Sequence, residues 1–491
     1  MTRGLLAGCV FLLVLLNLPL LSLAASESAP VSDATADCLD CHEVDTPGIV
    51  ADWRSSRHAA MTPEAALALP KRERRMSVAN VPESLRSVSV GCFECHGQRA
   101  DAHKDTFEHN DVRIHTVVSP DDCRTCHPVE AEQYAGSKKA YAVSNLDQNP
   151  LYHTLVDTIT EVPGNRHGTP PPAALDVNRS KSCFACHGTR VEMRGLKTIT
   201  SAGGDEVQVP VLSRWPNQGV GRINPDGSRG ACTACHPRHS FSIEVARDPH
   251  TCAQCHLEPD VPAWNVYEES KHGNIFLARG SRWDLSAVPW VVGRDFQAPT
   301  CATCHNSLLV TQDGDVVAER THDFGARLWV RIFGLIYTHP QPLQGDTSRI
   351  RNADGQPLPT TSDGKPAAEF LISPEEQQAR RSEMKRVCQA CHGTSWAEGH
   401  LAQLDETLAE TDAAVAAATK LMREAWSRKL ADPTNPFDEP LERKWVQQWL
   451  FYANSVRYAA AMGGPDYAAF KNGWWYLSGN LAEMHKSVGT K

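Results

Sequence analysis

The chain has 491 residues, a length that corresponds to roughly two to four globular units. Hydrophobic residues make up 41% and charged residues 22%, which excludes a disordered chain, a collagen-like fibre and a polytopic membrane protein. The net charge of −9 gives no electrostatic support for nucleic-acid binding. The unusual figures are 17 cysteines and 21 histidines, and any interpretation has to account for them.

Residues 1–25 are predicted to form a secretory signal peptide. Arg3 supplies the positive start, an apolar run extends from Leu5 to Leu23, and small residues precede Ala25. An uncleaved membrane anchor is the alternative, because a run of about this length can just span a bilayer. Pro19 favours cleavage. We therefore expect a periplasmic protein, or a membrane-associated one if the signal is retained.

The cysteines beyond the predicted signal form eight C-x-x-C-H motifs, and only Cys9 is left over. The motifs are Cys38, Cys41 and His42; Cys92, Cys95 and His96; Cys123, Cys126 and His127; Cys183, Cys186 and His187; Cys232, Cys235 and His236; Cys252, Cys255 and His256; Cys301, Cys304 and His305; and Cys388, Cys391 and His392. This motif attaches c-type haem: the two thiols bond to the haem and the histidine ligates its iron. Zinc ribbons and disulfides need no histidine after each second cysteine. We therefore predict eight covalently bound haem c groups.

Thirteen histidines lie outside the motifs and are candidates for the second axial position on iron. We predict this role for five of them, namely His58, His239, His272, His322 and His400. Two more, His109 and His115, compete for the region before Cys123. Lys139, in the segment GSKKA, can also ligate iron, although a solvated side chain is the simpler interpretation.

The expected fold class is mainly α. Residues 26–392 are predicted to form an octahaem domain of short helices and loops wrapped around the haems, with almost no sheet. Residues 393–491 are predicted to form a C-terminal helical bundle, because apolar residues recur there at spacings of three and four. The first helical seam comprises Leu401, Leu404, Leu408, Thr411, Val415, Ala418 and Met422. Further helices are expected over 440–462 and from Asp466 onward.

Several haems that lie close together can pass electrons from one to the next. An enzyme needs one iron with an open axial position and acid or base groups beside it. Motif spacing alone does not show which iron is open. A protein that only transfers electrons therefore stays an alternative at this point.

Four segments resemble the octahaem hydroxylamine oxidoreductase family. They are residues 219–260, YEESKHGNIF (267–276), APTCATCH (298–305) and THDFG (321–325). The order of the eight motifs and the helical tail resemble the family as well. This resemblance implies a homotrimer, a catalytic haem at the fourth motif with His187 on its iron, and seven relay haems with two histidines each. In the oxidising members it also implies a tyrosine cross-linked to the neighbouring subunit's catalytic haem, and an Asp-His pair that handles protons.

The sequence departs from the family at that proton-handling pair. Asp260 is present, but Val261 stands where a histidine is expected. Tyr467 lies in the region of the cross-linking tyrosine. Because Val261 cannot act as a base, the sequence favours reduction of nitrite or hydroxylamine to ammonium. The electrons are expected from a cytochrome or a quinol-linked donor. His153 or His167 is expected to help in supplying protons. The alternative is oxidation of hydroxylamine or hydrazine, with electrons passed to a cytochrome.

Overall fold

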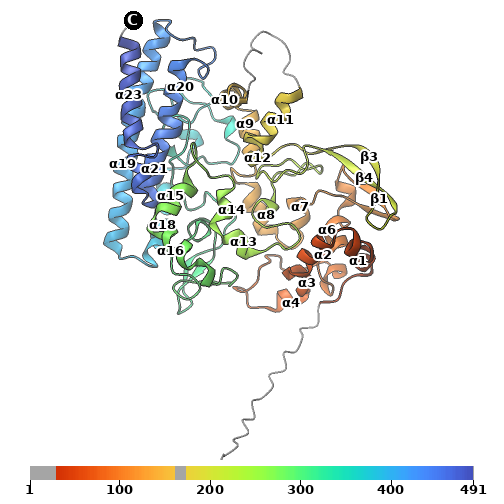
Figure 1. The fold of residues 1–491 in the computed structure, drawn as a ribbon. Coiled ribbons are helices and arrows are strands. Elements are labelled where there is room, and N and C mark those ends of the chain that lie inside the picture. Colours follow the sequence, from red (N-terminus) through yellow and green to blue (C-terminus); the bar gives the residue numbers. More distant parts are fainter. Residues whose placement is uncertain (1–28, 161–172, 490–491) are drawn as a thin grey trace, which may run out of the picture.

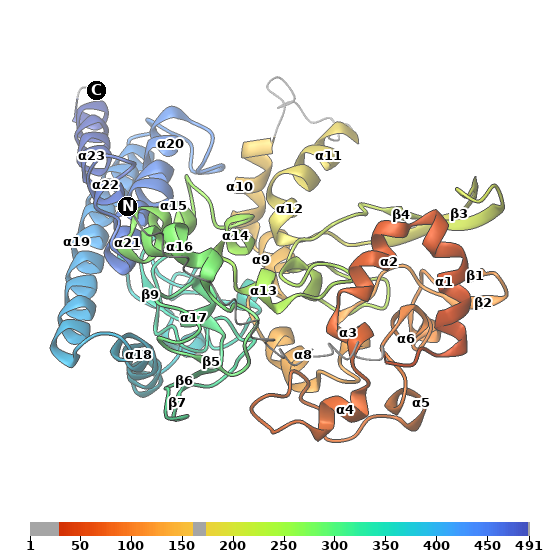
Figure 2. The same cartoon turned by 60° about the horizontal axis from the view of Figure 1, so that its bottom comes forward.

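The computed structural model describes residues 29–160 and 173–489, so the predicted signal peptide and His167 lie outside the described residues. Helices and loops dominate, which confirms the mainly α fold. The chain runs from an N-terminal cluster of short helices, through a central region of loops and short helices, to a stack of longer C-terminal helices at the opposite edge (Figures 1 and 2).

The N-terminal region consists of short helices because serine or threonine caps and prolines recur every few residues. Ser32, Ser56 and Thr62, for example, each accept a backbone N–H at a helix start. The helices are α1 (Asp33–Asp45), α2 (Pro47–Arg54), α3 (Arg57–Ala60), α4 (Pro63–Ala68), α5 (Glu83–Arg86), α6 (Cys92–His96), η1 (Ala100–Ala102), α7 (Pro120–Cys123), α8 (Pro128–Ala135), α9 (Ala142–Asp147) and α10 (Pro150–Thr160).

The central region continues in the same style. Its helices are α11 (Ala173–Lys181), α12 (Cys183–His187), η2 (Cys232–Ala234), α13 (Ile243–Arg247), α14 (Pro249–Ala253), α15 (Ala263–Glu269), α16 (Lys271–Arg279), η3 (Gly280–Arg282), α17 (Cys301–His305), η4 (Thr347–Arg349), η5 (Ala368–Phe370) and α18 (Pro374–Gln389). In α6, α12 and α17 the helix is the C-x-x-C-H motif itself. A single helical turn therefore presents both thiols and the histidine together.

Sheet is limited to four small pieces, as expected. The strands are β1 (Phe107–His109), β2 (Val112–Ile114), β3 (Glu192–Thr200), β4 (Glu206–Ser213), β5 (Trp290–Val291), β6 (Leu309–Val310), β7 (Val316–Ala318), β8 (Val330–Arg331) and β9 (His339–Pro340). They pair as β1-β2, β3-β4, β5-β6-β7 and β8-β9. The longest pairing is the antiparallel β3-β4 hairpin, which joins Thr200 to Glu206 near its tip and lies beside β1 (Figure 1).

The C-terminal helices pack side by side around α19 (Thr394–Ser427). They are α20 (Pro440–Val446), the π-helical stretch η6 (Gln447–Tyr452), α21 (Ala453–Met462), α22 (Pro465–Ala469) and α23 (Trp474–Gly489). All seven predicted seam residues of α19 are buried, which confirms its amphipathic pattern. Its core also includes Leu335, Ile336, Tyr337 and Leu358 from the preceding region.

The apolar core is divided into separate clusters rather than one mass. Besides the helical stack, a second cluster gathers Tyr267, Trp290 and Leu309, and a third gathers Met76, Val81 and Leu85. Within 29–160 and 173–489, no helix has the length and apolar content needed to cross a membrane. The clusters surround a large internal space, in which the motif cysteines and histidines lie.

Candidate haem-binding site

One continuous cavity of about 2700 Å³ runs through the N-terminal and central regions. All sixteen motif cysteines and all eight motif histidines line it. The sixteen cysteines are free thiols, so the chain does not use them as structural disulfides. A large interior lined by paired thiols and imidazoles matches the needs of thiol-bonded haem, which is apolar and needs a nitrogen ligand at its iron.

Thiols of different motifs approach one another across the cavity. Cys186 lies close enough to Cys255, and Cys252 close enough to Cys301, for the two thiols of each pair to shift one another's pKa. The same contact joins Cys38 to Cys92 and Cys123 to Cys232. The fourth motif is therefore next to the sixth, and the sixth is next to the seventh.

Several motif histidines are oriented by a bond to one ring nitrogen. The Nδ1 atom of His42 lies 2.9 Å from the Thr46 hydroxyl oxygen, that of His96 lies 2.7 Å from the His115 carbonyl oxygen, and that of His187 lies 3.4 Å from the Ala142 carbonyl oxygen. Such a bond occupies Nδ1 and leaves Nε2 for a metal. The motif histidines therefore fit the role of proximal iron ligand.

Three predicted distal histidines lie opposite a motif histidine. The ring centroids are 6.2 Å apart in His42–His109, 6.3 Å apart in His58–His127 and 6.0 Å apart in His272–His392. Imidazole nitrogens bind metals at about 2 Å, so two rings on opposite sides of one iron have centroids about 6 Å apart. Each pair therefore fits an iron between its rings.

His239, His322 and His400 also line the cavity. Burial is the main cause that lowers the pKa values of His322 and His239. The next largest cause is the charge of His236 for His322 and the charge of His96 for His239. His322 is thus a neighbour of the fifth motif and His239 of the second. His400 stands on α19 with Nε2 3.2 Å from the Ala461 carbonyl oxygen. Their assignment to particular irons stays a prediction.

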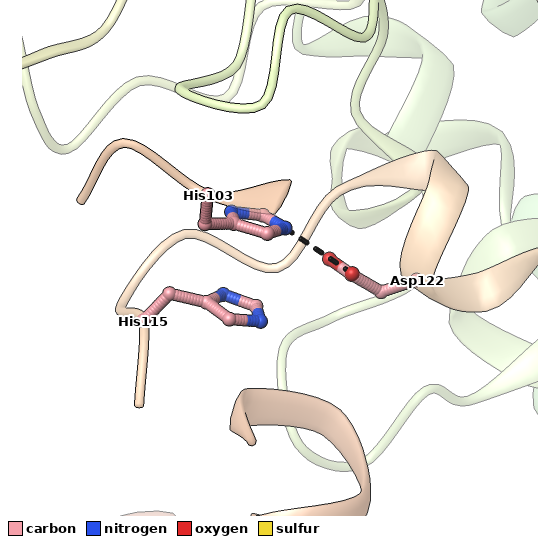
Figure 3. A group of neighbouring side chains, drawn as sticks. All are labelled: His103, His115 and Asp122. Atoms are coloured by element: carbon pink, nitrogen blue, oxygen red, sulfur yellow. Dashed lines mark hydrogen bonds and ion pairs between the residues drawn. The ribbon is translucent and has the colours of Figure 1, made fainter. Parts of the chain in front are cut away.

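His115 occupies a different position from the other predicted ligands. Its ring centroid is 6.0 Å from that of His96, but its own carbonyl accepts the His96 Nδ1 bond. The His115 ring therefore lies on the Nδ1 side of His96, away from Nε2. Its ring is stacked on that of His103, with the centroids 3.5 Å apart, and His103 hydrogen bonds with Asp122 (Figure 3). Asp105 hydrogen bonds with the other ring nitrogen of His103. His115 consequently does not stand across an iron from His96, and its predicted ligand role stays open.

Figure 3 also shows why His103, His115 and Asp122 do not form a separate metal site. The two imidazole planes are stacked nearly parallel, 7° apart. Imidazole lone pairs lie in the ring plane, so two stacked parallel rings do not converge on one ion. The carboxylates of Asp105 and Asp122 instead bracket His103 and, against the effect of its burial, raise its pKa to about 9.

Asp260 lies beside the fourth motif. Its negative charge acts on the pKa of both Cys183 and Cys186, which places the carboxylate near the haem-attachment thiols of His187. Burial raises the pKa of Asp260, so its carboxyl group retains a proton to higher pH than an ordinary aspartate. The Asn454 side-chain amide donates to the Asp260 carbonyl oxygen at 3.2 Å and anchors this loop to α21.

Arg331, Tyr152 and Tyr458 complete the surroundings of His187, and all three line the cavity. After burial, the charge of Arg331 is the largest influence that lowers the pKa of His187, and the charge of Lys139 comes next. Burial raises the pKa values of both tyrosines, with Arg331 acting against the rise, and Asp260 adds to the rise at Tyr458. Sequence reasoning gave no site role to Arg331 or Tyr458, because no local pattern links 331 and 458 to the fourth motif.

Two other predicted site residues lie away from this cavity. Tyr467 is buried against Val266 and Ala459, and its hydroxyl donates to Glu258 Oε2 at 2.8 Å. Its predicted bond to a neighbouring subunit stays a prediction. His153 is half exposed, pairs with Asp157 at 3.3 Å, and does not line the cavity.

Five motif histidines, His96, His187, His236, His256 and His305, have no imidazole ring across from Nε2 at the 6 Å spacing among the described residues, since His115 lies on the Nδ1 side of His96. His236 has His322 nearby. For His187, the surrounding groups are a carboxyl, a guanidinium and two phenols. This is the composition of a site for small polar molecules beside an iron.

Comparisons with known proteins agree with this description. A family model described as "Seven times multi-haem cytochrome CxxCH" matches residues 223–320, and one described as "Cytochrome c554 and c-prime" matches residues 122–208. A solved structure of a hypothetical multiheme protein is 43% identical, with a TM-score of 0.89, and the match covers 95% of this chain and 97% of that one.

Two proteins of Kuenenia stuttgartiensis are more distant. A probable nitrite reductase-hydroxylamine oxidoreductase fusion protein is 24% identical over 402 residues, which are 81% of this chain and 38% of the fusion protein. The chain thus spans well under half the length of this curated relative. A reducing hydroxylamine oxidoreductase-like (HAO-like) protein complex has a TM-score of 0.56 at 19% identity, covering 93% of this chain and 85% of that one; at this identity the likeness concerns the fold.

The fold and the cavity define a multihaem c-type cytochrome with covalently bound haem. The chain belongs to the multihaem cytochrome c family, in the group that shares the fold of HAO-like proteins.

Proposed function

We propose that the protein is an exported octahaem oxidoreductase that reduces nitrite or hydroxylamine to ammonium at the iron held by His187. The observation that carries the proposal is the group of Asp260, Arg331 and Tyr458 around the fourth motif. A haem iron with a free axial position binds small nitrogen compounds, and neighbouring haems supply electrons one at a time.

The residues around His187 suit a reaction that consumes protons. Nitrite takes up six electrons and eight protons to form ammonium and two waters. Asp260, with its raised pKa, holds a proton that it delivers to the substrate. The phenol of Tyr458 lines the same cavity, and Val261 offers no base to accept protons in the reverse direction.

Arg331 gives the site a preference for anions. Its guanidinium lies near His187 and both tyrosines, in a cavity where charges are poorly screened. Its Nε donates to the Phe333 carbonyl oxygen at 2.6 Å, which fixes the side chain in place. Nitrite therefore meets a fixed positive charge, whereas hydroxylamine binds without that contribution.

Contacts between motifs support an electron route to this site. The Cys186–Cys255 and Cys252–Cys301 contacts bring the fourth, sixth and seventh motifs together. Electrons from a cytochrome or a quinol-linked donor would reach His187 through haems attached at these motifs. Successive transfers without release of intermediates need such a chain of close cofactors.

A steady-state assay with a reduced low-potential donor tests the proposal. We expect consumption of nitrite and hydroxylamine with ammonium as product. No turnover with either substrate would refute it. Rapid hydroxylamine oxidation with a cytochrome acceptor, and no reduction, would instead favour the oxidative alternative, which the resemblance to oxidising family members keeps as the second candidate.

A protein that only carries electrons is distinguished by ligand binding. If every iron has two protein ligands, cyanide does not bind the native ferric protein. We expect cyanide to bind, with a stoichiometry of one per chain. We further propose export to the periplasm through residues 1–25, and assembly as a homotrimer, both tested on protein purified from cell fractions.

A further inference from the structure

Three segments of the chain repeat one local pattern: an aromatic residue, two variable residues, a serine, a basic residue, and then histidine or lysine. They are Trp53–His58, Tyr134–Lys139 and Tyr267–His272. The aromatic residue is buried in each. The segments are far apart in sequence, so the repetition points to a shared structural task.

The serine makes the same two hydrogen bonds in all three segments. Ser56, Ser137 and Ser270 are 2%, 3% and 1% exposed. The backbone N–H of each serine donates to the carbonyl of its aromatic residue, at 2.8, 2.9 and 3.0 Å. Each hydroxyl then accepts the backbone N–H three residues later, at 3.1, 3.5 and 3.1 Å, from Ala59, Ala140 and Gly273. The three segments therefore share both bonds, although a helix follows directly only after Ser56 and Ser270.

In two of the three segments the final residue faces a motif histidine. His58 lies opposite His127 and His272 lies opposite His392, at 6.3 and 6.0 Å between ring centroids. In the middle segment the same position holds Lys139. The shared geometry places a primary amine where the other two segments place an iron-facing imidazole.

The surroundings of Lys139 suit a ligand. Its side chain lines the haem cavity, with Nζ 4.8 Å from the centroid of the Phe324 ring. Among the described residues it has no hydrogen-bond acceptor for Nζ and no carboxylate partner. An ammonium group left in such a cavity without a partner is unfavourable. Binding of the neutral amine to a metal removes that cost.

Electrostatics indicates which iron is nearest. Burial is the main cause that lowers the pKa of His256 to about 3, and the charge of Lys139 is the second largest. Hydrogen bonds between thiols dominate the pKa values of Cys252 and Cys255, and the Lys139 charge acts on both as well. In the seventh motif that charge acts on the pKa of His305 but is not among the main influences on its two cysteines. It also acts on the pKa of His187, where the Arg331 charge acts more strongly, and on that of Cys235. The sixth motif is therefore the closer one.

We propose that Lys139 is the second axial ligand of the haem iron held by His256, which gives this iron one imidazole and one amine ligand. His115, which lies on the Nδ1 side of His96 and is stacked on His103, is then not required as a ligand. Six histidines and Lys139 supply second ligands for seven irons, and the iron of His187 stays open. The six are His58, His109, His239, His272, His322 and His400.

Electron paramagnetic resonance of the ferric holoprotein tests this assignment without any turnover. In Lys139→Ala we expect one additional high-spin haem per chain and one additional cyanide bound. The matched control is Lys138→Ala, because Lys138 is the adjacent buried amine that lines the same cavity; its spectrum should equal that of the wild type. An unchanged low-spin count in Lys139→Ala overturns the proposal.

Lys139→His covers the case in which the alanine variant fails to mature. It should assemble with full haem content and remain low-spin, with the signal of one haem moved to g values typical of two imidazole ligands. Unmoved g values overturn the proposal. A crystal structure of the wild-type holoprotein with a histidine bound opposite His256 also overturns it. Neither readout depends on reductase activity, so the proposed function can fail separately.

Discussion

Asp412 forms an ion pair with Arg457, the only fully buried arginine of the C-terminal helical stack. The guanidinium of Arg457, on α21, is 0% exposed, and its Nη2 donates to Asp412 Oδ1 on α19 at 2.6 Å. The same carboxylate accepts the backbone N–H of Thr338 at 3.2 Å and the Thr338 hydroxyl. Asp412→Ala therefore leaves a buried cation and a buried N–H without their main acceptor.

The structure sets the size of the effect. Removing one partner of a buried ion pair costs about 3–5 kcal/mol in the free energy of unfolding, since the remaining charge is uncompensated. Arg457 keeps bonds to Thr411 Oγ1 at 3.1 Å, Asn454 Oδ1 at 3.3 Å and the Ile332 carbonyl at 3.3 Å. These acceptors are neutral and compensate in part for the missing carboxylate. We therefore expect a decrease in the free energy of unfolding at the lower end of this range, about 3 kcal/mol.

Urea unfolding of the holoprotein, followed by far-UV circular dichroism, measures this change. The matched control is Asp405→Ala on the same helix. Asp405 pairs with Arg381 at 2.7 Å, but their side chains are 47% and 23% exposed. An ion pair of this kind contributes about 0–1 kcal/mol. Combining Asp412→Leu with Arg457→Met should recover most of the lost stability, because no charge then stays buried.

Equal, small shifts for Asp412→Ala and Asp405→Ala would refute the reasoning. So would a double variant as unstable as Asp412→Ala, since the cost would then come from packing rather than from the buried charge. The slope of the unfolding curve must be unchanged for these comparisons to report stability alone.

Three further predictions concern the site. Asp260→Asn should lower kcat for nitrite by a factor of about 10²–10⁴ if Asp260 is the proton donor. Because the pKa of Asp260 is raised, the wild-type rate should fall as pH rises through that pKa. A variant with the same pH profile as the wild type contradicts this role. Arg331→Gln should raise KM for nitrite by about tenfold, the equivalent of about 1.4 kcal/mol, with a smaller change for uncharged hydroxylamine; equal changes for both would show that Arg331 is not an anion site. Intact mass under denaturing conditions should give a monomer with eight haems, whereas a covalent trimer that disappears in Tyr467→Phe would establish the tyrosine cross-link and favour oxidation.

Local patterns were read correctly from the sequence because their causes are local. The C-x-x-C-H motif brings thiols and imidazole together within one helical turn, as α6, α12 and α17 show. The three- and four-residue spacing in α19 buries one face whatever it packs against. The β3-β4 hairpin was not foreseen, because its exposed residues alternate only weakly in polarity.

The sequence by itself predicted where haem attaches and which histidine each motif supplies, and it determined that the C-terminal region is helical. Each of these follows from residues within one or a few turns of backbone. Only the tertiary structure decided that His58 faces His127, that His115 lies on the Nδ1 side of His96, and that Arg331 and Asp260 both lie near the fourth motif. Those pairings depend on how distant segments pack around the cavity, and no spacing along the chain encodes them.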